Sequence, residues 1–213
     1  GGRVEAFSEI DIPEWTIENK DVYGTGEVIG LSGLLTDERK SLLGSGIIIR
    51  KEAWQSLFKR NFRFSNEANE QNTECLFKEL CAGLRLSGWR LYVNNDLKTK
   101  KLFTEKELGW KYLRELYRGA GKSLPSSDIY KNIPHSSKKK KINDFSSLYK
   151  RQTSARKQIR SIYRKLRNQP NWNREFFTNT GEGNQHVLDS EKYLGRIAKH
   201  LAAIPTYAKK LRL

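Results

Sequence analysis

Side chains that could react or bind a metal are few in this chain, and their spacing matches no familiar site. Cys75 and Cys81 lie six residues apart, which fits neither a zinc nor a redox motif. We therefore expect two buried thiols in a reducing compartment. The histidines, at positions 135, 186 and 200, are not at ligand spacing from a carboxylate or a cysteine, so they predict no metal site. The stretch GTGEVIG lacks the preceding hydrophobic strand and the following helix that a phosphate-binding loop requires.

A more informative stretch is KELCAGLRLSGWRLYVNNDL, residues 78–97, which predicts a helix that turns directly into a strand. Apolar residues between positions 80 and 86 form one stripe at helical spacing, and Gly88 ends the helix. The residues WRLYV then predict a strand, which the turn residues 94–96 close. Whether this pair of elements belongs to a site or only to a core depends on its neighbours.

The neighbouring segments indicate a mixed α/β domain. GGRVEAF predicts a strand, GIIIR predicts a second strand, and KEAWQSLFKR predicts a short helix. TEKELGWKYLRELYRG predicts a longer helix, in which Thr104 and Glu107 have capping-box spacing. Gly119 and Gly121 are expected to end that helix.

The net charge of +16 is concentrated toward the C-terminal end of the chain. Residues 138–213 hold 19 Lys and Arg against 5 Asp and Glu, a net charge of +14, whereas residues 1–137 carry only +2. We therefore predict a core domain over 1–133, a basic linker over 134–146 and a basic helical C-terminal extension over 147–213.

Two amphipathic helical segments are expected in the extension, one over residues 147–168 and one after Asp189. The first has the apolar stripe Ile159, Ile162, Tyr163 and Leu166, and the second has the stripe Leu194, Ile197, Ala198 and Leu201.

No stretch approaches the roughly 18 apolar residues of a transmembrane helix, and the start lacks an apolar signal segment. These features predict a cytoplasmic protein. The chain contains no methionine and opens on Gly-Gly, which we interpret as a fragment of a longer chain.

Three stretches in this order, GSGIIIRKEAW, ELCAGLRLSGWRLYVNNDL and LGWKYLRELYRGAG, resemble the C-terminal half of family 2 glycosyltransferases, which build bacterial polysaccharides. The opening GGRV and the later EGNQHVLDSEKYLGRIAKHLAAI are similar to the family as well, so the resemblance covers nearly the whole chain. It implies an α/β fold with a partial GT-A-like mixed sheet and flanking helices, followed by a basic α-helical tail.

The resemblance also implies a reaction. In the family, a hydroxyl of a glycan acceptor attacks a nucleotide sugar in one inverting displacement, and an aspartate at the head of the ELC helix accepts the hydroxyl proton. A divalent metal, Mg²⁺ or Mn²⁺, held by a DxD sequence, neutralises the departing diphosphate. These 213 residues contain no DxD, so we expect that metal only with an N-terminal half that holds the donor.

The aspartate that the resemblance requires is not found. Aligned on Gly88-Trp89, the family's acidic pair falls on Leu76 and Phe77; aligned on NTEC, it falls on residues 71–72, which are Gln and Asn. Neither an apolar side chain nor an amide accepts a proton at neutral pH.

Glu74 and Glu79 lie on the same helix and are the candidate substitutes for the catalytic base. The alternative is that each is an ordinary solvated or helix-supporting carboxylate. Glu74 is the better placed of the two, because it lies nearer the N-terminal end of the helix, where the family's aspartate meets the acceptor.

Other candidate site residues follow from the same resemblance. Lys101 stands where the family often has a histidine near the diphosphate, and it could pair with phosphate; the alternative is a lysine on an exposed edge. Trp89 and Tyr92 could stack on an acceptor sugar or belong to the core. Gly44 and Gly46 resemble the family's backbone turn at the acceptor loop; the alternative is a plain loop before a strand.

Three functions remain open at this point. The first is a glycosyltransferase that is incomplete or inactive as this chain, and the second is a catalytically degenerate relative kept for binding or assembly. The third is a nucleic-acid binder. Two observations argue against it: the excess positive charge is concentrated in the tail, and the sequence has no nucleic-acid-binding motif. The basic tail also suits a peripheral enzyme at the anionic inner surface of a membrane, so such a surface is an expected partner.

Overall fold

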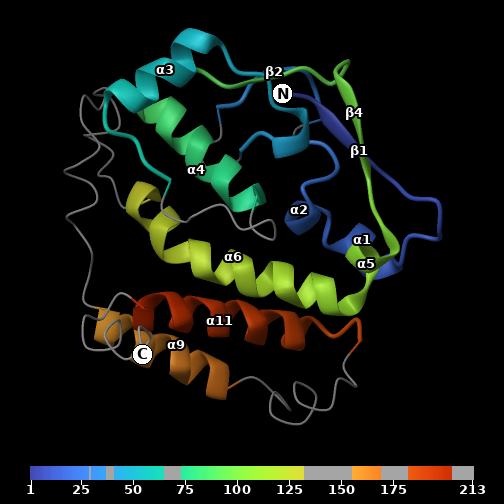
Figure 1. Cartoon of the computed structure of the whole chain (residues 1–213), viewed down its shortest axis with the longest axis vertical. Coiled ribbons are helices and arrows are strands. Elements are labelled where there is room, and N and C mark those ends of the chain that lie inside the picture. Colours follow the sequence, from blue (N-terminus) through green and yellow to red (C-terminus); the bar gives the residue numbers. More distant parts are fainter. Residues whose placement is uncertain (29, 37–40, 65–72, 132–154, 169–181, 203–213) are drawn as a thin grey trace.

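The computed structural model describes residues 1–28, 30–36, 41–64, 73–131, 155–168 and 182–202 (Figure 1). Within these residues the fold is mixed α/β, with more helix than strand. The elements are β1 (Arg3–Phe7), α1 (Glu14–Glu18), α2 (Lys20–Tyr23), β2 (Gly33–Leu34), the 3-10 turn η1 (Gly44–Gly46), α3 (Lys51–Lys59), α4 (Thr73–Leu86), β3 (Tyr92–Val93), β4 (Lys98–Leu102), α5 (Glu105–Leu108), α6 (Trp110–Lys131), α9 (Ala155–Arg167) and α11 (Gln185–Ala202).

The strands of the described residues form two small sheets. β1 pairs in parallel with β4, in a register that sets Arg3 opposite Lys98 and Phe7 opposite Leu102. β2 pairs antiparallel with β3, with Leu34 opposite Tyr92. The expected strand GIIIR is wrong, because residues 47–50 belong to no strand and Ile48 is 73% exposed.

The helix and turn expected from residues 78–97 are confirmed. α4 ends at Leu86, and Gly88 has a φ of 88°, a left-handed conformation that glycine adopts without steric cost. The backbone N–H of Trp89 donates to the carbonyl of Leu84, which closes the helix end in the usual way. The strand that follows is shorter than expected, since only Tyr92–Val93 pairs.

A first apolar core lies between α3, α4 and the segment that leads into β3. Its buried residues are Leu35, Leu42, Ala53, Leu57, Phe62, Leu80, Cys81, Leu84, Leu91 and Val93. The helix expected over KEAWQSLFKR is confirmed as α3, which buries Ala53 and Leu57 on its inner side. The burial of Cys81 agrees with the expectation for that thiol, whereas the side chain of Cys75 lies outside the described residues.

A second core lies where α2, α5, α6 and α11 meet, and its buried residues are Tyr23, Phe103, Leu108, Trp110, Leu113, Tyr117, Val187 and Leu188. The capping box expected at Thr104 and Glu107 is present and begins α5. The chain then breaks at Gly109, where the backbone is extended (ψ 145°), and restarts as α6. The helix α6 contributes buried residues to the second core and also contacts α4, which belongs to the first core.

The expected helix end at Gly119 and Gly121 is wrong, because α6 continues through both residues to Lys131. The reason is tertiary packing. A Cβ at Gly121 would overlap the backbone carbonyl of Lys192 in α11, so glycine here permits two helices to approach closely. Figure 1 shows α6, α11 and α9 lying side by side as a layer of helices.

The two helices expected in the extension are present, with altered bounds and faces. α9 buries Ile162, but Tyr163 is 58% exposed and does not share the buried stripe. α11 begins at Gln185, before Asp189, and buries Val187, Leu188 and Glu191 more deeply than the expected stripe from Leu194 onward. The expected linker, 134–146, lies outside the described residues. Among the helices that are described, none combines the length and the apolar character needed to cross a membrane.

Candidate functional site

The turn η1 lies against the first half of α4 and the start of β1. Gly44 is buried, and a Cβ added there would overlap the ring of Phe77 in α4. A Cβ at Gly46 would lie 3.3 Å from Cγ2 of Val4 in β1. The two glycines therefore allow the turn to fit between a helix and a strand. Both expected acceptor-loop glycines lie at this junction.

Phe77 occupies one of the two positions on which the resembled family's acidic pair falls. Its ring is partly buried and packs against the first apolar core as well as against Gly44. The alternative position, residues 71–72, lies outside the described residues, as does the side chain of Glu74. The backbone of Glu74 belongs to the first turn of α4.

Glu79 lies on the inner side of α4, where it is only 1% exposed. Its chain neighbours Leu80 and Cys81 are buried to the same degree. A carboxylate buried this deeply is kept in a folded protein only with polar or charged partners, and Glu79 does have interactions within the structure. Because it does not reach the surface, an acceptor hydroxyl from solvent has no access to it in this arrangement.

The two candidate aromatic residues have different surroundings. Trp89 packs against the first core, and its Nε1–H donates a hydrogen bond of 3.0 Å to Oγ of Ser56 in α3. Tyr92 is 55% exposed on β3, directly opposite Leu34, which is 45% exposed. Tyr92 therefore presents a ring beside an apolar neighbour at the surface, whereas Trp89 ties α3 to the end of α4.

Lys101 points toward the body of the protein. Its Nζ donates a hydrogen bond of 2.6 Å to the backbone carbonyl of Tyr23 and lies 5.4 Å from the centre of the Phe103 ring. The observed role of Lys101 is to connect β4 with α2.

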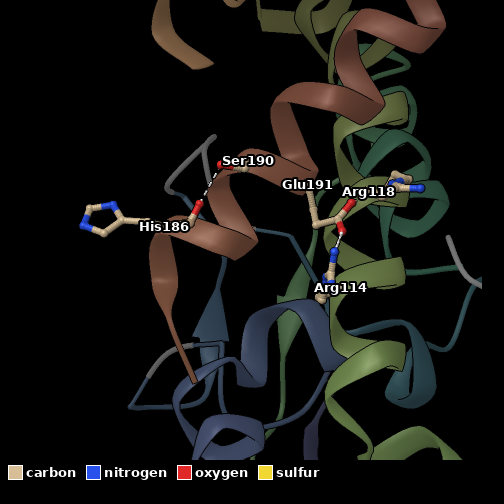
Figure 2. A network of polar contacts seen from close by, with 5 residues as sticks. All are labelled: Arg114, Arg118, His186, Ser190 and Glu191. Carbon is tan, nitrogen blue, oxygen red and sulfur yellow. Dashed lines mark hydrogen bonds and ion pairs between the residues drawn. The ribbon is translucent and has the colours of Figure 1, made fainter. Parts of the chain in front are cut away.

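A buried ion pair that the sequence interpretation missed connects α6 with α11 (Figure 2). The carboxylate of Glu191, whose side chain is 3% exposed, accepts from Nε of Arg114 at 2.9 Å and from Nε of Arg118 at 2.6 Å. Figure 2 shows both guanidinium groups converging on Glu191, while the His186 ring points away from them. The available signal was the spacing of the two arginines, four residues apart on one helix face.

Two buried tyrosines complete the polar part of the second core. The Tyr117 hydroxyl donates a hydrogen bond of 2.5 Å to Oδ1 of Asn19, and the Tyr23 hydroxyl donates to the carbonyl of Glu107 at 3.2 Å. Burial raises the pKa of Tyr23 to about 12, against a smaller opposing effect of the nearby Thr16 hydroxyl. Burial raises the pKa of Tyr117 as well.

Of the expected site residues, Gly44, Gly46 and the helix of Glu79 lie together. Tyr92 is instead exposed on β3, and Lys101 is hydrogen-bonded to the backbone carbonyl of Tyr23. Within the described part of the chain, no three His, Cys, Asp or Glu side chains are grouped so that they could hold a metal ion. No protein-family model, no curated protein and no solved structure matches the chain.

Proposed function

We propose that the chain is the acceptor-side part of a family 2 GT-A glycosyltransferase, which transfers a sugar from a nucleotide sugar to a glycan acceptor in polysaccharide synthesis. The mixed α/β fold and the order of its elements support this proposal. Along the chain, β1 comes before the Gly-Ser-Gly turn η1, and α1, α2 and β2 lie between them. The turn is followed by α3, by α4 with the left-handed Gly88 after its end, and by β3.

The contact between Gly44 and Phe77 is the observation that carries the proposal. The resemblance assigns the glycine turn to the acceptor loop and the head of α4 to the catalytic base, so the two segments have to lie together in such an enzyme. They touch here, although more than thirty residues separate them in the sequence. A side chain at position 44 would occupy the place of the Phe77 ring.

The same contact supports a second candidate, a catalytically degenerate glycosyltransferase that binds glycans or assists assembly. A phenyl ring at the position of the base accepts no proton, and Glu79 is buried away from solvent. The described residues also lack the donor set for Mg²⁺ or Mn²⁺, so we assign no step to a metal in this part of the protein.

The glycosyltransferase proposal requires that the chain binds a glycan, as does the glycan-binding form of the degenerate candidate. Among the expected site residues, Tyr92 is an exposed aromatic residue that tests this. Binding of a panel of bacterial oligosaccharides should be measured by saturation-transfer NMR with the 213-residue chain. We expect Tyr92→Ala to weaken binding about ten-fold, because a sugar face loses its aromatic partner. Tyr163→Ala is the matched control, since it removes an exposed tyrosine from α9. Absence of binding across the panel would contradict the glycosyltransferase proposal and the glycan-binding form of the degenerate candidate.

A transfer assay separates the two candidates. The 213-residue chain alone should transfer no sugar from a mixture of nucleotide sugars, with or without Mg²⁺ or Mn²⁺; turnover by it would contradict our description of an incomplete site. Once the chain is joined to a nucleotide-sugar half, Glu74→Gln and Glu79→Gln should be compared at saturating donor. Loss of a general base lowers the rate about 10²–10⁴-fold. An inert joined wild type would favour the degenerate candidate.

A further inference from the structure

The helix α9 carries charge of one sign only. Its sequence ARKQIRSIYRKLR contains six Lys and Arg and no Asp or Glu. Such a helix exposes a continuous positive surface if its charged side faces solvent and no neighbouring carboxylate neutralises it.

The charged side of α9 faces solvent. Arg160, Arg164 and Arg167 are exposed, and their spacing of four and three residues sets them on one face of the helix. Tyr163, 58% exposed, flanks the same face, whereas Ile162 is 5% exposed on the opposite side. The exposed stripe of α9, consisting of Arg160, Tyr163, Arg164 and Arg167, therefore points away from the protein.

The apolar side of α9 packs against the protein. α9 packs along α11, and Figure 1 shows it as the outermost helix of its layer, at the end of the molecule opposite α3. Among the described residues, no ion pair is found for the three arginines of the stripe. Glu191 is the most deeply buried carboxylate of the neighbouring α11, and it forms ion pairs with Arg114 and Arg118 of α6.

We propose that the exposed stripe of α9 is a docking surface for an anionic lipid bilayer. The partner is recognised by its phosphate and carboxylate headgroups, to which guanidinium groups donate paired hydrogen bonds. Since Ile162 faces α11, the helix binds by charge at the headgroups and does not bury an apolar face in the acyl region, unlike a free amphipathic helix.

A bilayer fits this surface better than a nucleic acid does. α9 packs against α11 and is the outermost helix of its layer in Figure 1, so the arginine stripe lies on the outside of that layer. Base-specific duplex binding instead places a helix inside the major groove, and single strands are bound by aromatic side chains in a charged groove. The described part of α9 offers a single exposed tyrosine.

The test is flotation of the 213-residue chain with vesicles of phosphatidylcholine alone or with about 30% phosphatidylserine. We expect binding only to the vesicles that contain phosphatidylserine, and release at about 0.5 M NaCl because salt screens surface charge. The variant Arg160→Gln/Arg164→Gln/Arg167→Gln should bind them about 100-fold more weakly. The corresponding Arg→Lys variant, which retains the charge, should bind within about ten-fold of wild type.

The matched control is Lys51→Gln/Lys59→Gln/Arg90→Gln, which removes the same charge from exposed residues outside α9. It should lower binding only a few-fold. Equal weakening by both triple variants would overturn the proposal, because net charge rather than the stripe would then govern binding. Equal binding to neutral vesicles would overturn it too, as would tighter stripe-dependent binding to duplex DNA than to the anionic vesicles.

Discussion

Gly195 of α11 lies directly against the backbone carbonyl of Arg118 in α6, so that a methyl group at position 195 would overlap that oxygen. Gly121 of α6 has the reciprocal relation to the carbonyl of Lys192 in α11. Each helix thus presents a glycine to the backbone of the other. This close approach also brings Arg114 and Arg118 within hydrogen-bonding distance of Glu191.

The first prediction concerns this helix contact. Gly195→Ala should lower the free energy of unfolding by about 1–3 kcal/mol, since the obstacle is backbone and the helices have to move apart. This loss should appear even though alanine favours a helix over glycine by roughly 1 kcal/mol. Urea unfolding followed by circular dichroism measures it.

Gly33→Ala is the control, because a Cβ at Gly33 meets no atom within 4 Å. Its free energy of unfolding should stay within about 0.5 kcal/mol of wild type. If Gly195→Ala proved as stable as Gly33→Ala, the close approach of α6 and α11 would be refuted.

The second prediction tests the junction at η1. Gly44→Ala should destabilise the protein by about 1–3 kcal/mol, because the added methyl group overlaps the Phe77 ring. In a Phe77→Ala background the same substitution should cost much less, since the ring is then absent. A double-mutant cycle by urea unfolding gives the coupling, which we expect to exceed about 1 kcal/mol. Additive effects of the two substitutions would mean that the residues do not touch.

Local sequence patterns predicted the elements whose boundaries are set by local chemistry. The capping box at Thr104 and Glu107 and the left-handed Gly88 are of this kind, because turn geometry restricts which residues occupy such positions. α3 was likewise predicted as a helix, but its buried face was not, since Trp54 and Phe58 are 41% and 43% exposed while Ala53 and Leu57 are buried.

The errors arose where packing between distant segments overrides local preference. Gly119 and Gly121 predicted a helix end, but α6 continues through both residues. Gly121 packs directly against the backbone of α11. In the candidate site, the sequence identified Gly44 and the helix of Glu79, yet it could not show that Phe77 fills the space between turn and helix. The sequence could not predict the burial of Glu191 either, because its arginine partners lie more than seventy residues earlier in the chain.

The third prediction concerns the ion pair between α6 and α11. Glu191→Ala should destabilise the protein by about 3–5 kcal/mol, because it leaves the largely buried guanidinium of Arg114 without this carboxylate. Arg118→Gln should cost no more than about 1 kcal/mol, since the Arg118 side chain is 47% exposed and its charge is screened by solvent. Urea unfolding at neutral pH measures both. Similar losses in the two variants would contradict this assignment of buried and exposed partners.

The last prediction is a pH dependence. The pKa of Tyr23 is raised to about 12 by burial, so the folded state favours the neutral phenol. The resulting stability is fully present below pH ~10, the ordinary pKa of tyrosine, and is lost as the pH rises through ~12. The two-unit difference corresponds to roughly 2–3 kcal/mol.

Tyr23→Phe should cost about 1 kcal/mol at neutral pH, through the lost hydrogen bond to Glu107, but should lose less stability than wild type between pH ~9 and ~11. Urea unfolding across this range gives the slopes, and Tyr163→Phe, which removes an exposed hydroxyl, should follow wild type throughout. A Tyr23→Phe slope equal to that of wild type would show that this phenol is not the group that destabilises the protein in alkali.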